Sequence, residues 1–349
     1  MNATRNHQSV SLTAQPELAA NNHTMNDPLS GHTIFVTGAA GFIGSHTVER
    51  LLARGAKVVG VDNFDPYYSR RLKEQNIANI RNTAGCFEFF ESDICDRDTM
   101  RALFSRVKPR GVIHLAAKAG VRPSIEDPVG YANANVTGTA VMLDCAHHFG
   151  CDRIVIASSS SVYGNSQEVP FSETLDVNAP ISPYAASKRS CEIIAHAHHH
   201  LTKMPTALLR FFTVFGPRQR PDLAIEKFLR KVAAGESIEM FGDGSTSRDY
   251  TFVDDIVTGV LASYERVPDY GYRIWNLGGS HPTTLREMID TISRVVGRPA
   301  NIVNKPMQPG DVDRTWADLS RSCAELGFNP TTDFESGVRQ QWTWICKHG

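Results

Sequence analysis

The chain of 349 residues lacks long apolar runs, an excess of either charge, and closely spaced cysteine pairs. No stretch approaches the roughly 20 apolar residues that a membrane-spanning helix needs. The 36 Lys and Arg nearly balance the 37 Asp and Glu, so no overall field favours nucleic acid or an anionic membrane. The seven cysteines, an odd number never spaced C-x-x-C, favour reduced packing thiols. These absences predict a soluble cytoplasmic protein with no nucleic-acid or membrane partner.

The polar N-terminal segment lacks the features of a targeting sequence. It has neither the apolar core of a signal peptide nor the repeated arginines of a transit peptide. We predict a disordered extension over residues 1–31. Met25 could equally be the natural start, because folding signals begin only at His32.

From His32 onward, short β-branched segments alternate with helical segments. The expected strands are Thr33–Thr37, Lys57–Val61, Phe87–Phe90, Gly111–Leu115, Arg153–Ala157 and Ala207–Phe211. The expected helices are Phe42–Arg54, Ser69–Asn82, Asp98–Val107, Pro128–Phe149 and Pro183–Lys203. This alternation predicts an α/β fold of the Rossmann type, a doubly wound parallel sheet with helices on both faces.

The first expected strand leads into a glycine turn and a helix. Gly38 permits the tight turn, Gly41 lets the backbone approach a pyrophosphate, and Gly44 lets the helix pack closely on the strand. Glycines that serve only turns and packing can produce the same triplet, but the strand before it and the helix after it favour a cofactor site. The phosphates would lie on amides at the helix start, around Phe42 and Ile43.

Asp62 ends the second strand about 20 residues past the glycines, where a carboxylate accepts hydrogen bonds from an adenosine ribose. It would repel a 2′-phosphate, which favours NAD over NADP, although Arg70 and Arg71 lie nearby. Other residues that follow strands border the same crevice and are expected to contact the cofactor: Asn63, Asp93, Ile94, Leu115, Ala116 and Ala117.

Tyr184 and Lys188 lie one helical turn apart, just after Pro183 at a helix start. A free phenol is a poor base at neutral pH. A nearby ammonium stabilises its phenolate, and a bound nicotinamide cation would act the same way. Alone, such a pair is most often a surface pair. Upstream, however, a strand ends in the four hydroxyls of Ser158–Ser161, which suit a substrate hydroxyl or ketone.

Together these motifs resemble the extended short-chain dehydrogenase/reductases that act on nucleotide sugars, the NAD-dependent epimerase/dehydratase family. The resemblance runs from about Thr33 to the last helix. It implies that Ser159 assists the substrate hydroxyl, that Tyr184 is the acid and base, and that Lys188 holds the nicotinamide ribose. Asn135 matches the asparagine that these enzymes carry beside a helix of the cofactor domain.

Longer stretches are similar to UDP-glucuronate 4-epimerases: residues 62–70, 119–124, 210–220, 241–250 and 308–312. UDP-galactose epimerases typically have asparagine where Thr213 stands and arginine where Gln308 stands. The similarity implies an isomerase with tightly bound NAD that epimerises UDP-glucuronate at C4 to UDP-galacturonate through a transient 4-keto intermediate. The alternatives are a 4-epimerase of a neutral or N-acetylated UDP-sugar and a UDP-glucuronate decarboxylase.

The same resemblance bears on the choice between these reactions. Related dehydratases carry Asp-Glu, and decarboxylases Ser-Glu, at the positions of Ser160 and Ser161. This chain has no acid there, so we expect the hydride to return to the sugar. We hypothesise that Thr213, Ser160 and Arg220 hold the C6 carboxylate out of line with the ketone. The resemblance assigns Arg248 to the diphosphate.

After Thr213, Gly and Pro punctuate shorter elements, which predicts a smaller, irregular α/β substrate domain. We expect an NAD-binding domain over residues 32–213, with returning segments near 249–276, and a mainly sugar-nucleotide-binding domain over 214–349. The resemblance implies a homodimer through helices near 128–149 and 183–203. Histidines cluster on both helices, but His196 and His200 have no obvious carboxylate or thiol partner, so we predict no metal site.

Overall fold

The computed structural model describes residues 27–306 and 312–348. Its centre is a seven-stranded sheet in the order β10-β6-β5-β4-β1-β2-β3, with every neighbouring pair parallel. The strands are β1 (Thr33–Thr37), β2 (Lys57–Asp62), β3 (Cys86–Glu91), β4 (Gly111–His114), β5 (Arg153–Ser159), β6 (Thr206–Phe211) and β10 (Tyr272–Leu277). The order 3-2-1-4-5-6 is that of dinucleotide-binding sheets. The expected doubly wound Rossmann fold is therefore confirmed.

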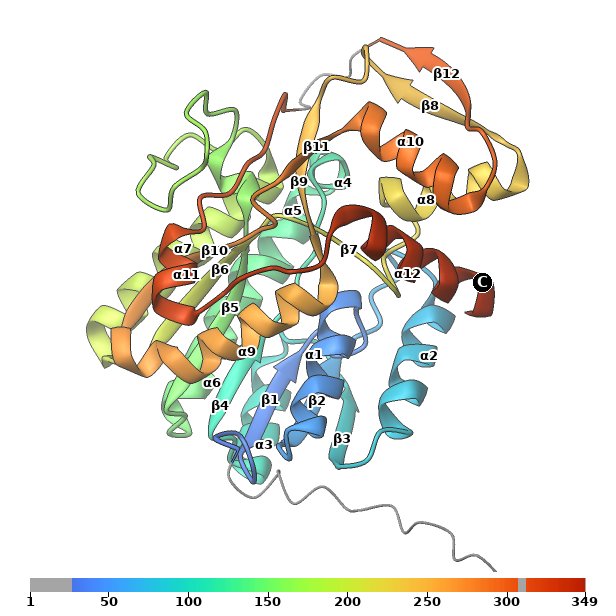
Figure 1. The fold of residues 1–349 in the computed structure, drawn as a ribbon. Coiled ribbons are helices and arrows are strands. Elements are labelled where there is room, and N and C mark those ends of the chain that lie inside the picture. Colours follow the sequence, from blue (N-terminus) through green and yellow to red (C-terminus); the bar gives the residue numbers. More distant parts are fainter. Residues whose placement is uncertain (1–26, 307–311, 349) are drawn as a thin grey trace, which may run out of the picture.

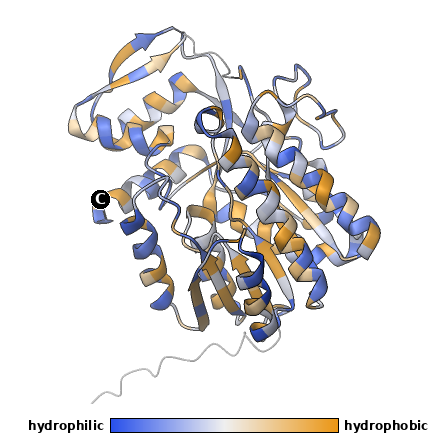
Figure 2. Ribbon diagram, turned by 180° about the vertical axis from the view of Figure 1, so that it is seen from behind, coloured by the Kyte–Doolittle hydropathy of each residue, from blue (hydrophilic) through white to orange (hydrophobic). Residues whose placement is uncertain are grey.

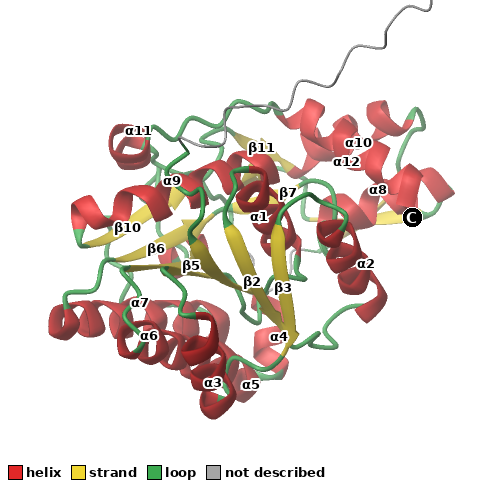
Figure 3. Ribbon diagram, turned by 90° about the horizontal axis from the view of Figure 1, so that it is seen from below, coloured by secondary structure: helices red, strands yellow, loops and turns green. Residues whose placement is uncertain are grey.

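Helices cover both faces of this sheet (Figure 3). On one face lie α1 (Phe42–Ala53), α2 (Arg70–Arg81), α9 (Val253–Tyr270) and α11 (Ser320–Leu326). On the other lie α3 (Arg97–Val107), α6 (Gly138–His148) and α7 (Pro183–Thr202). Among the described helices, none is long and apolar enough to cross a membrane.

The strands are apolar on both sides because each separates two cores. Ile34 and Val36 of β1 pack in the core beneath α1 and α9, whereas Phe35 between them packs against α3 and α6. The same alternation recurs in β5, where Val155 faces the first core and Ile154 the second. Successive side chains of a strand point to opposite faces of the sheet. Because both faces are buried, the sequence of each central strand is apolar along almost its whole length (Figure 2).

A second group of elements lies over the carboxyl ends of the central strands (Figure 1). It contains a three-stranded sheet, in the order β11-β9-β7, and a parallel pair, β12-β8. Its strands are β7 (Thr213–Phe215), β8 (Ser237–Phe241), β9 (Ser247–Phe252), β11 (Pro282–Thr284) and β12 (Asn301–Lys305). Its helices are α8 (Ala224–Ala234), α10 (Leu285–Val296) and α12 (Phe334–His348). Between these elements the chain returns to the central sheet through α9 and β10.

The folded chain begins earlier than the boundary expected at His32. Leu29 is buried in the first core, and both carboxylate oxygens of Asp27 accept hydrogen bonds from Arg54, the residue that caps the C-terminal end of α1. Residues 27–31 therefore belong to the fold rather than to an extension, because an apolar side chain and an ion pair attach them to α1. Residues 1–26, which include Met25, lie outside the described residues, as does Gln308.

The helical segment expected over Pro128–Phe149 is confirmed in its extent, but it is not one regular α-helix. The structure has α5 (Pro128–Tyr131), then a π-helical turn over Ala132–Thr137, then α6, with a short α4 (Val121–Glu126) before them. Periodicity does not reveal this change, because every residue from α5 to α6 keeps a helical backbone while the hydrogen-bond spacing widens. π-Helical turns occur often at functional sites.

Candidate active site

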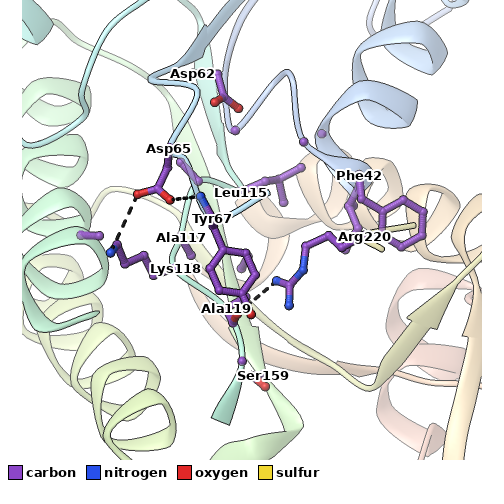
Figure 4. A pocket seen from close by; sticks show the side chains of 18 of the residues that line it. Phe42, Asp62, Asp65, Tyr67, Leu115, Ala117, Lys118, Ala119, Ser159 and Arg220 are labelled. Carbon is purple, nitrogen blue, oxygen red and sulfur yellow. Dashed lines mark hydrogen bonds and ion pairs between the residues drawn. The ribbon is translucent and has the colours of Figure 1, made fainter. Parts of the chain in front are cut away.

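A cleft of about 570 Å³ opens where the central strands end. Ligands bind at this edge in doubly wound sheets. The glycine turn, the segments after β2 to β7 and the start of α7 form its walls (Figure 4). Seventeen residues that the sequence had singled out line it: Gly38, Gly41, Phe42, Ile43, Gly44, Asp62, Asn63, Asp93, Ile94, Leu115, Ala116, Ala117, Ser159, Tyr184, Lys188, Thr213 and Arg220.

The glycine turn leaves no room for side chains. A Cβ at Gly44 would lie 1.9 Å from the carbonyl oxygen of Gly38, and a Cβ at Gly38 would lie 2.8 Å from the amide nitrogen of Ala116. Gly38 also has a φ of 71°, which L side chains rarely adopt. No side chain caps α1 at Gly41. The start of this helix therefore offers uncapped amides to the cleft, an arrangement that suits a pyrophosphate.

Asp62 is buried at the end of β2 and held by the turn beside it. Its carboxylate accepts hydrogen bonds from the amides of Ala40, at 3.2 Å, and Phe64, at 2.9 Å. Burial raises the pKa of this carboxyl, and the positive charge of Lys73 opposes the rise. The Lys73 ammonium lies 4.0 Å from Asp62. Both charges face the end of the cleft where the sequence predicts an adenosine ribose.

Tyr184 and Lys188 lie on the first turns of α7, which face the cleft. Ser182 caps this helix by accepting a hydrogen bond from the amide of Ala185, and Pro183 begins it. The buried ammonium of Lys188 donates a 2.8 Å hydrogen bond to the carbonyl oxygen of Ala157 in β5. This bond holds the lysine at the strand end and leaves two of its N–H donors for other partners.

Ser159 brings a hydroxyl to the same wall (Figure 4). Its oxygen accepts a 3.1 Å hydrogen bond from the amide of Ser161, so the hydroxyl hydrogen is free to be donated. The next residues, Ser160–Tyr163, form a 3₁₀ turn that directs the chain away from the strand. Ser159, Tyr184 and Lys188 therefore present a hydroxyl, a phenol and an ammonium on one side of the cleft.

A buried ion pair lies behind this wall. Glu192, one turn after Lys188, accepts two hydrogen bonds of 2.9 Å from Arg210 of β6 and one of 2.7 Å from the hydroxyl of Ser158. Although burial opposes ionisation, the hydrogen bonds from Arg210 hold the pKa of Glu192 below its ordinary value. The pair joins α7 to β5 and β6 directly beneath the cleft.

Arg220 reaches the cleft from the segment after β7, but other groups already hold it. It donates two hydrogen bonds to the carboxylate of Asp222 and one of 3.1 Å to the carbonyl oxygen of Ala119. Its guanidinium also lies 4.8 Å from the ring centroid of Tyr67 (Figure 4). Its charge is compensated within the chain, which weakens the expectation that it is reserved for a substrate carboxylate.

Asn135 is not on the cleft wall, contrary to the expectation that it contacts the cofactor. Its side-chain oxygen accepts from the amide of Lys118, and its side-chain nitrogen donates to the carbonyl of Lys118 and to Ser187. Both amide hydrogens are therefore used. From the π-helical turn, Asn135 therefore joins the segment after β4 to α7. Both of these line the cleft, so Asn135 helps to hold two of its walls together.

Ser160 and Arg248 also lie off the walls of the cleft. Ser160 begins the 3₁₀ turn that leaves the strand end. Arg248, in β9, donates to the carbonyl oxygens of Ser247 and Asp313. Neither residue is among those that line the cleft of the described chain, and the roles that the resemblance implied for them stay predictions.

The histidine clusters on α6 and α7 meet as aromatic neighbours. The rings of His147 and His198 pack edge to face with centroids 5.7 Å apart. Within residues 27–306 and 312–348, no three His, Cys, Asp or Glu side chains gather as a metal site would require. His147 and His198 thus contribute to the contact between α6 and α7.

Comparison with known proteins agrees with this geometry. A family model described as GDP-mannose 4,6 dehydratase matches residues 35–341. The chain belongs to this family. A UDP-glucuronate 4-epimerase of Thermodesulfobacterium geofontis (strain OPF15) is 38% identical over 310 residues, which cover 88% of this chain and 94% of that protein.

Two solved structures in complex with UDP-sugars share the fold. The crystal structure of the UDP-glucuronic acid 4-epimerase from Bacillus cereus, with UDP-glucuronic acid and NAD, matches with a TM-score of 0.84 and 33% identity, covering 90% of this chain and 99% of that one. The UDP-N-acetylglucosamine 4-epimerase from Methanobrevibacter ruminantium M1, with UDP-N-acetylmuramic acid, has a TM-score of 0.84 and 30% identity, covering 92% of this chain and 100% of that one.

Several residues on the walls of this family member's cleft had no role assigned from the sequence. They include Asp65, Tyr67, Tyr68, Lys73 and Lys118. Tyr67 and Tyr68 stand in a stretch that carried the resemblance, which is the one signal that could have drawn attention to them. Lys73 and Lys118 look like ordinary solvated lysines in sequence, and only the folding of their segments brings them to the cleft.

Proposed function

We propose that this chain binds NAD in the cleft and epimerises UDP-glucuronate at C4 to UDP-galacturonate. One observation carries the proposal: Ser159, Tyr184 and Lys188 meet on a single wall, beside the glycine turn that begins α1. The residues present fit a dinucleotide, because Gly38 and Gly44 exclude side chains and the start of α1 is uncapped. The named relatives with UDP-glucuronate support the choice of sugar.

The three side chains divide the chemistry at C4. Tyr184, as phenolate, removes the proton of the C4 hydroxyl, while Ser159 donates a hydrogen bond to the same oxygen. The ammonium of Lys188 stabilises the phenolate and holds the nicotinamide ribose. NAD, when bound, would supply reversible hydride transfer at C4. Tyr184 then gives its proton back to the C4 oxygen, so its side chain ends each cycle as the phenolate with which it began.

Epimerisation requires that the 4-ketone turns over in the cleft and is not diverted. With glucuronate, the ketone lies β to the C6 carboxylate, so loss of carbon dioxide competes. The chain has Ser160 and Ser161 where related dehydratases carry Asp-Glu and decarboxylases carry Ser-Glu. Thr213 and Arg220 on the cleft wall are our candidates for holding the carboxylate, with Arg220 leaving part of its contact with Asp222.

Product analysis tests this function directly. The purified chain incubated with UDP-glucuronate is expected to yield an equilibrium mixture with UDP-galacturonate, resolved by chromatography and proton NMR. UDP-pentose as the main product would overturn the proposal in favour of a decarboxylase. Conversion of UDP-glucose or UDP-N-acetylglucosamine in preference to UDP-glucuronate would favour the second candidate, a 4-epimerase of neutral or N-acetylated sugars, which the similarity to the N-acetylglucosamine epimerase supports.

Replacing Tyr184 provides the mechanistic test. Tyr184→Phe removes the phenol oxygen but keeps the ring, so we expect turnover to fall at least about 100-fold while UDP-glucuronate still binds. Tyr264→Phe is the matched control. Tyr264 lies in α9, and its hydroxyl is buried without a hydrogen-bond partner in the described part of the chain. Equal turnover in the two variants would remove Tyr184 from the mechanism.

We also propose the division of labour between the parts of the chain. Residues 32–213 and the returning α9 and β10 hold NAD, and the later elements above the strand ends hold the sugar nucleotide. A reducing compartment such as the cytoplasm fits the seven free cysteines. Two copies associate through the helices near 128–149 and 183–203. Exposed apolar side chains support this surface: Val129, Ile193 and Leu201.

A further inference from the structure

The two candidate contacts for the substrate carboxylate stand at the two ends of one short segment. This segment, residues 213–220, begins with β7 and is called the arm below. Thr213 and Arg220 both line the cleft, and the chain leaves the wall after Val214 and returns to it at Arg220. The position of Arg220 relative to Thr213 therefore depends on what holds the turn between them.

The sheet holds only the start of the arm. β7 is three residues long and stands at the edge of its sheet, where it pairs with β9 alone among the described strands. An edge strand leaves backbone groups on one side without a strand partner. Here side chains supply partners. The carbonyl oxygen of Val214 accepts a 2.9 Å hydrogen bond from the side chain of Gln219, and the amide of Gly216 donates a 3.0 Å bond to the side-chain oxygen of Gln341.

Gln341 joins these bonds into one buried network. It lies in the C-terminal helix α12, which packs beside α8 and β7 (Figure 1). Its side-chain nitrogen donates to the side-chain oxygen of Gln219, at 2.9 Å, and to the carboxylate of Glu226 in α8, at 2.8 Å. Gln341 is fully buried, and Gln219 and Glu226 are 4% and 2% exposed. The oxygen and both amide hydrogens of Gln341 are therefore used.

Attaching α12 to the rest of the fold does not require these polar groups. Val338 and Ile345 of the same helix already pack in the first core. A buried amide costs free energy unless its hydrogen bonds are made, whereas apolar packing has no such condition. Hydrogen bonds add direction, because they weaken steeply when the angle departs from linearity. Two bonds of the network end on the main chain of the arm, at Val214 and Gly216, so the network specifies the path of the arm.

The middle of the turn is attached to a different helix. The ring of His46 in α1 donates a 3.0 Å hydrogen bond to the carbonyl oxygen of Pro217, and Arg218 donates a 2.8 Å bond to Glu49. These contacts leave the backbone amide of Gly216 and the side chain of Gln219 to Gln341. The arm thus depends on α12 at the two residues that begin and end its turn.

We propose that Gln341 is a positioning residue for recognition of the substrate carboxylate, which fixes the arm so that Thr213 and Arg220 meet the C6 carboxylate together. The inference rests on the proposed function, in which these two residues hold that carboxylate. Gln341 is not among the described residues that line the cleft, so it acts through the arm. Without its amide, Gly216 loses a buried acceptor, the turn relaxes, and the charge-assisted contact of Arg220 with the carboxylate weakens.

Comparing two ligands that differ at C6 tests this role. UDP-glucuronate has a carboxylate where UDP-glucose has a hydroxymethyl group, so the ratio of their dissociation constants reports the carboxylate contact. Isothermal titration calorimetry is carried out on the NAD-loaded chain with Tyr184→Phe as the parent, because this change is expected to prevent turnover. We expect Gln341→Met to weaken UDP-glucuronate at least about tenfold, the contribution of a hydrogen bond to a charged group, and UDP-glucose less than about threefold.

Two further variants sharpen the comparison. Gln340→Met, at the exposed neighbouring position of α12, is the matched control and should change neither affinity. Gln219→Met breaks the same network from the arm and should also weaken UDP-glucuronate selectively. Because both glutamines act through one contact, the double variant should lose no more than about twofold beyond the larger single loss, whereas independent damage at two sites would multiply.

The outcomes separate this inference from the proposed function. If the Tyr184→Phe parent binds the two ligands equally, the proposed carboxylate contact fails and the inference fails with it. If the parent prefers UDP-glucuronate and Gln341→Met weakens both ligands alike, or neither, Gln341 only stabilises the fold and the inference alone is overturned. Should Gln341→Met not fold, Gln219→Met decides: a ratio of dissociation constants within twofold of the parent's overturns the inference.

Discussion

At the scale of single residues, the hydrogen bonds around the buried imidazole of His114 favour its neutral form. Thr37 accepts a hydrogen bond from the amide of Ala116, so its hydroxyl hydrogen is directed to Nδ1 of His114, 2.7 Å away. The other ring nitrogen lies 3.1 Å from the hydroxyl of Thr139, which donates in turn to Cys191. A proton added to Nδ1 would face the hydroxyl hydrogen of Thr37 instead of a lone pair. The neutral ring is therefore the one that fits.

This arrangement predicts an acid-sensitive contribution to stability. Burial lowers the pKa of His114 to about 3. The unfolded chain binds the proton more readily than the folded chain. The contribution of neutral His114 to the free energy of unfolding is therefore complete above the ordinary histidine pKa near 6.5, and it is lost as the pH falls from there towards 3. Between pH 7 and pH 5 the loss is about 2 kcal/mol.

The measurement is the free energy of unfolding by urea at both pH values. His114→Gln keeps a donor and an acceptor but cannot titrate, so its stability should fall by about 2 kcal/mol less over this interval than that of the unchanged chain. Other titrating groups are common to both proteins and cancel. Equal losses in the two proteins would show that His114 does not carry this dependence.

At the scale of elements, the placement of α7 depends on the pair of Glu192 and Arg210. Both side chains are fully buried, and with Ser158 they join the helix that carries Tyr184 to the strand end. Breaking a buried pair leaves an uncompensated charge, which costs about 3–5 kcal/mol. Glu192→Gln should therefore lower the free energy of unfolding by that amount.

An exposed pair provides the control for this prediction. Glu74→Gln removes the partner of Arg70 in an i,i+4 pair on the surface of α2, where such pairs contribute about 0.3–0.5 kcal/mol. Denaturant unfolding of both variants compares the two sites. Similar small losses would mean that α7 is held by apolar packing and not by its ion pair.

At the scale of the whole molecule, the proposed dimer makes a measurable prediction. Leu201 and Ile193 are 80% and 54% exposed on α7, an arrangement that exposes apolar surface to water unless a second copy covers it. Sedimentation equilibrium should give twice the chain mass of 38.5 kDa. Ile193→Glu combined with Leu201→Glu should shift the association equilibrium from the dimer to the single chain.

The matched control for the dimer lies elsewhere on the surface. Val303 of β12 is 41% exposed, and Val303→Glu should leave the mass doubled. A single-chain mass for the unchanged protein at micromolar concentration would contradict the proposed association. Dissociation by Val303→Glu would place the interface on β12 instead of α7.

The sequence predicted best where local chemistry determines structure. Six of the seven strands of the central sheet were located to within about two residues, and only β10 was not expected. Strands that are buried on both faces require apolar β-branched runs, which are easy to recognise. The glycine turn was equally clear, since no other residue fits at Gly38 or Gly44. The π-helical turn within the helix over Pro128–Phe149 was not foreseen, because no residue type in the sequence marks where the hydrogen-bond spacing widens. Asn135 lies in this turn and donates to Ser187 of α7.

The sequence by itself therefore determined the Rossmann sheet, the glycine turn and the residue types at the strand ends. Tertiary structure alone decided how the charged side chains are used. Arg220 donates to the carbonyl oxygen of Ala119 and lies over the ring of Tyr67, and both partners come from segments far from it along the chain. The physical reason is range: turns and strands follow from neighbouring residues, whereas the energy of a charge depends on its burial and on whichever opposite charge the fold brings within a few ångströms.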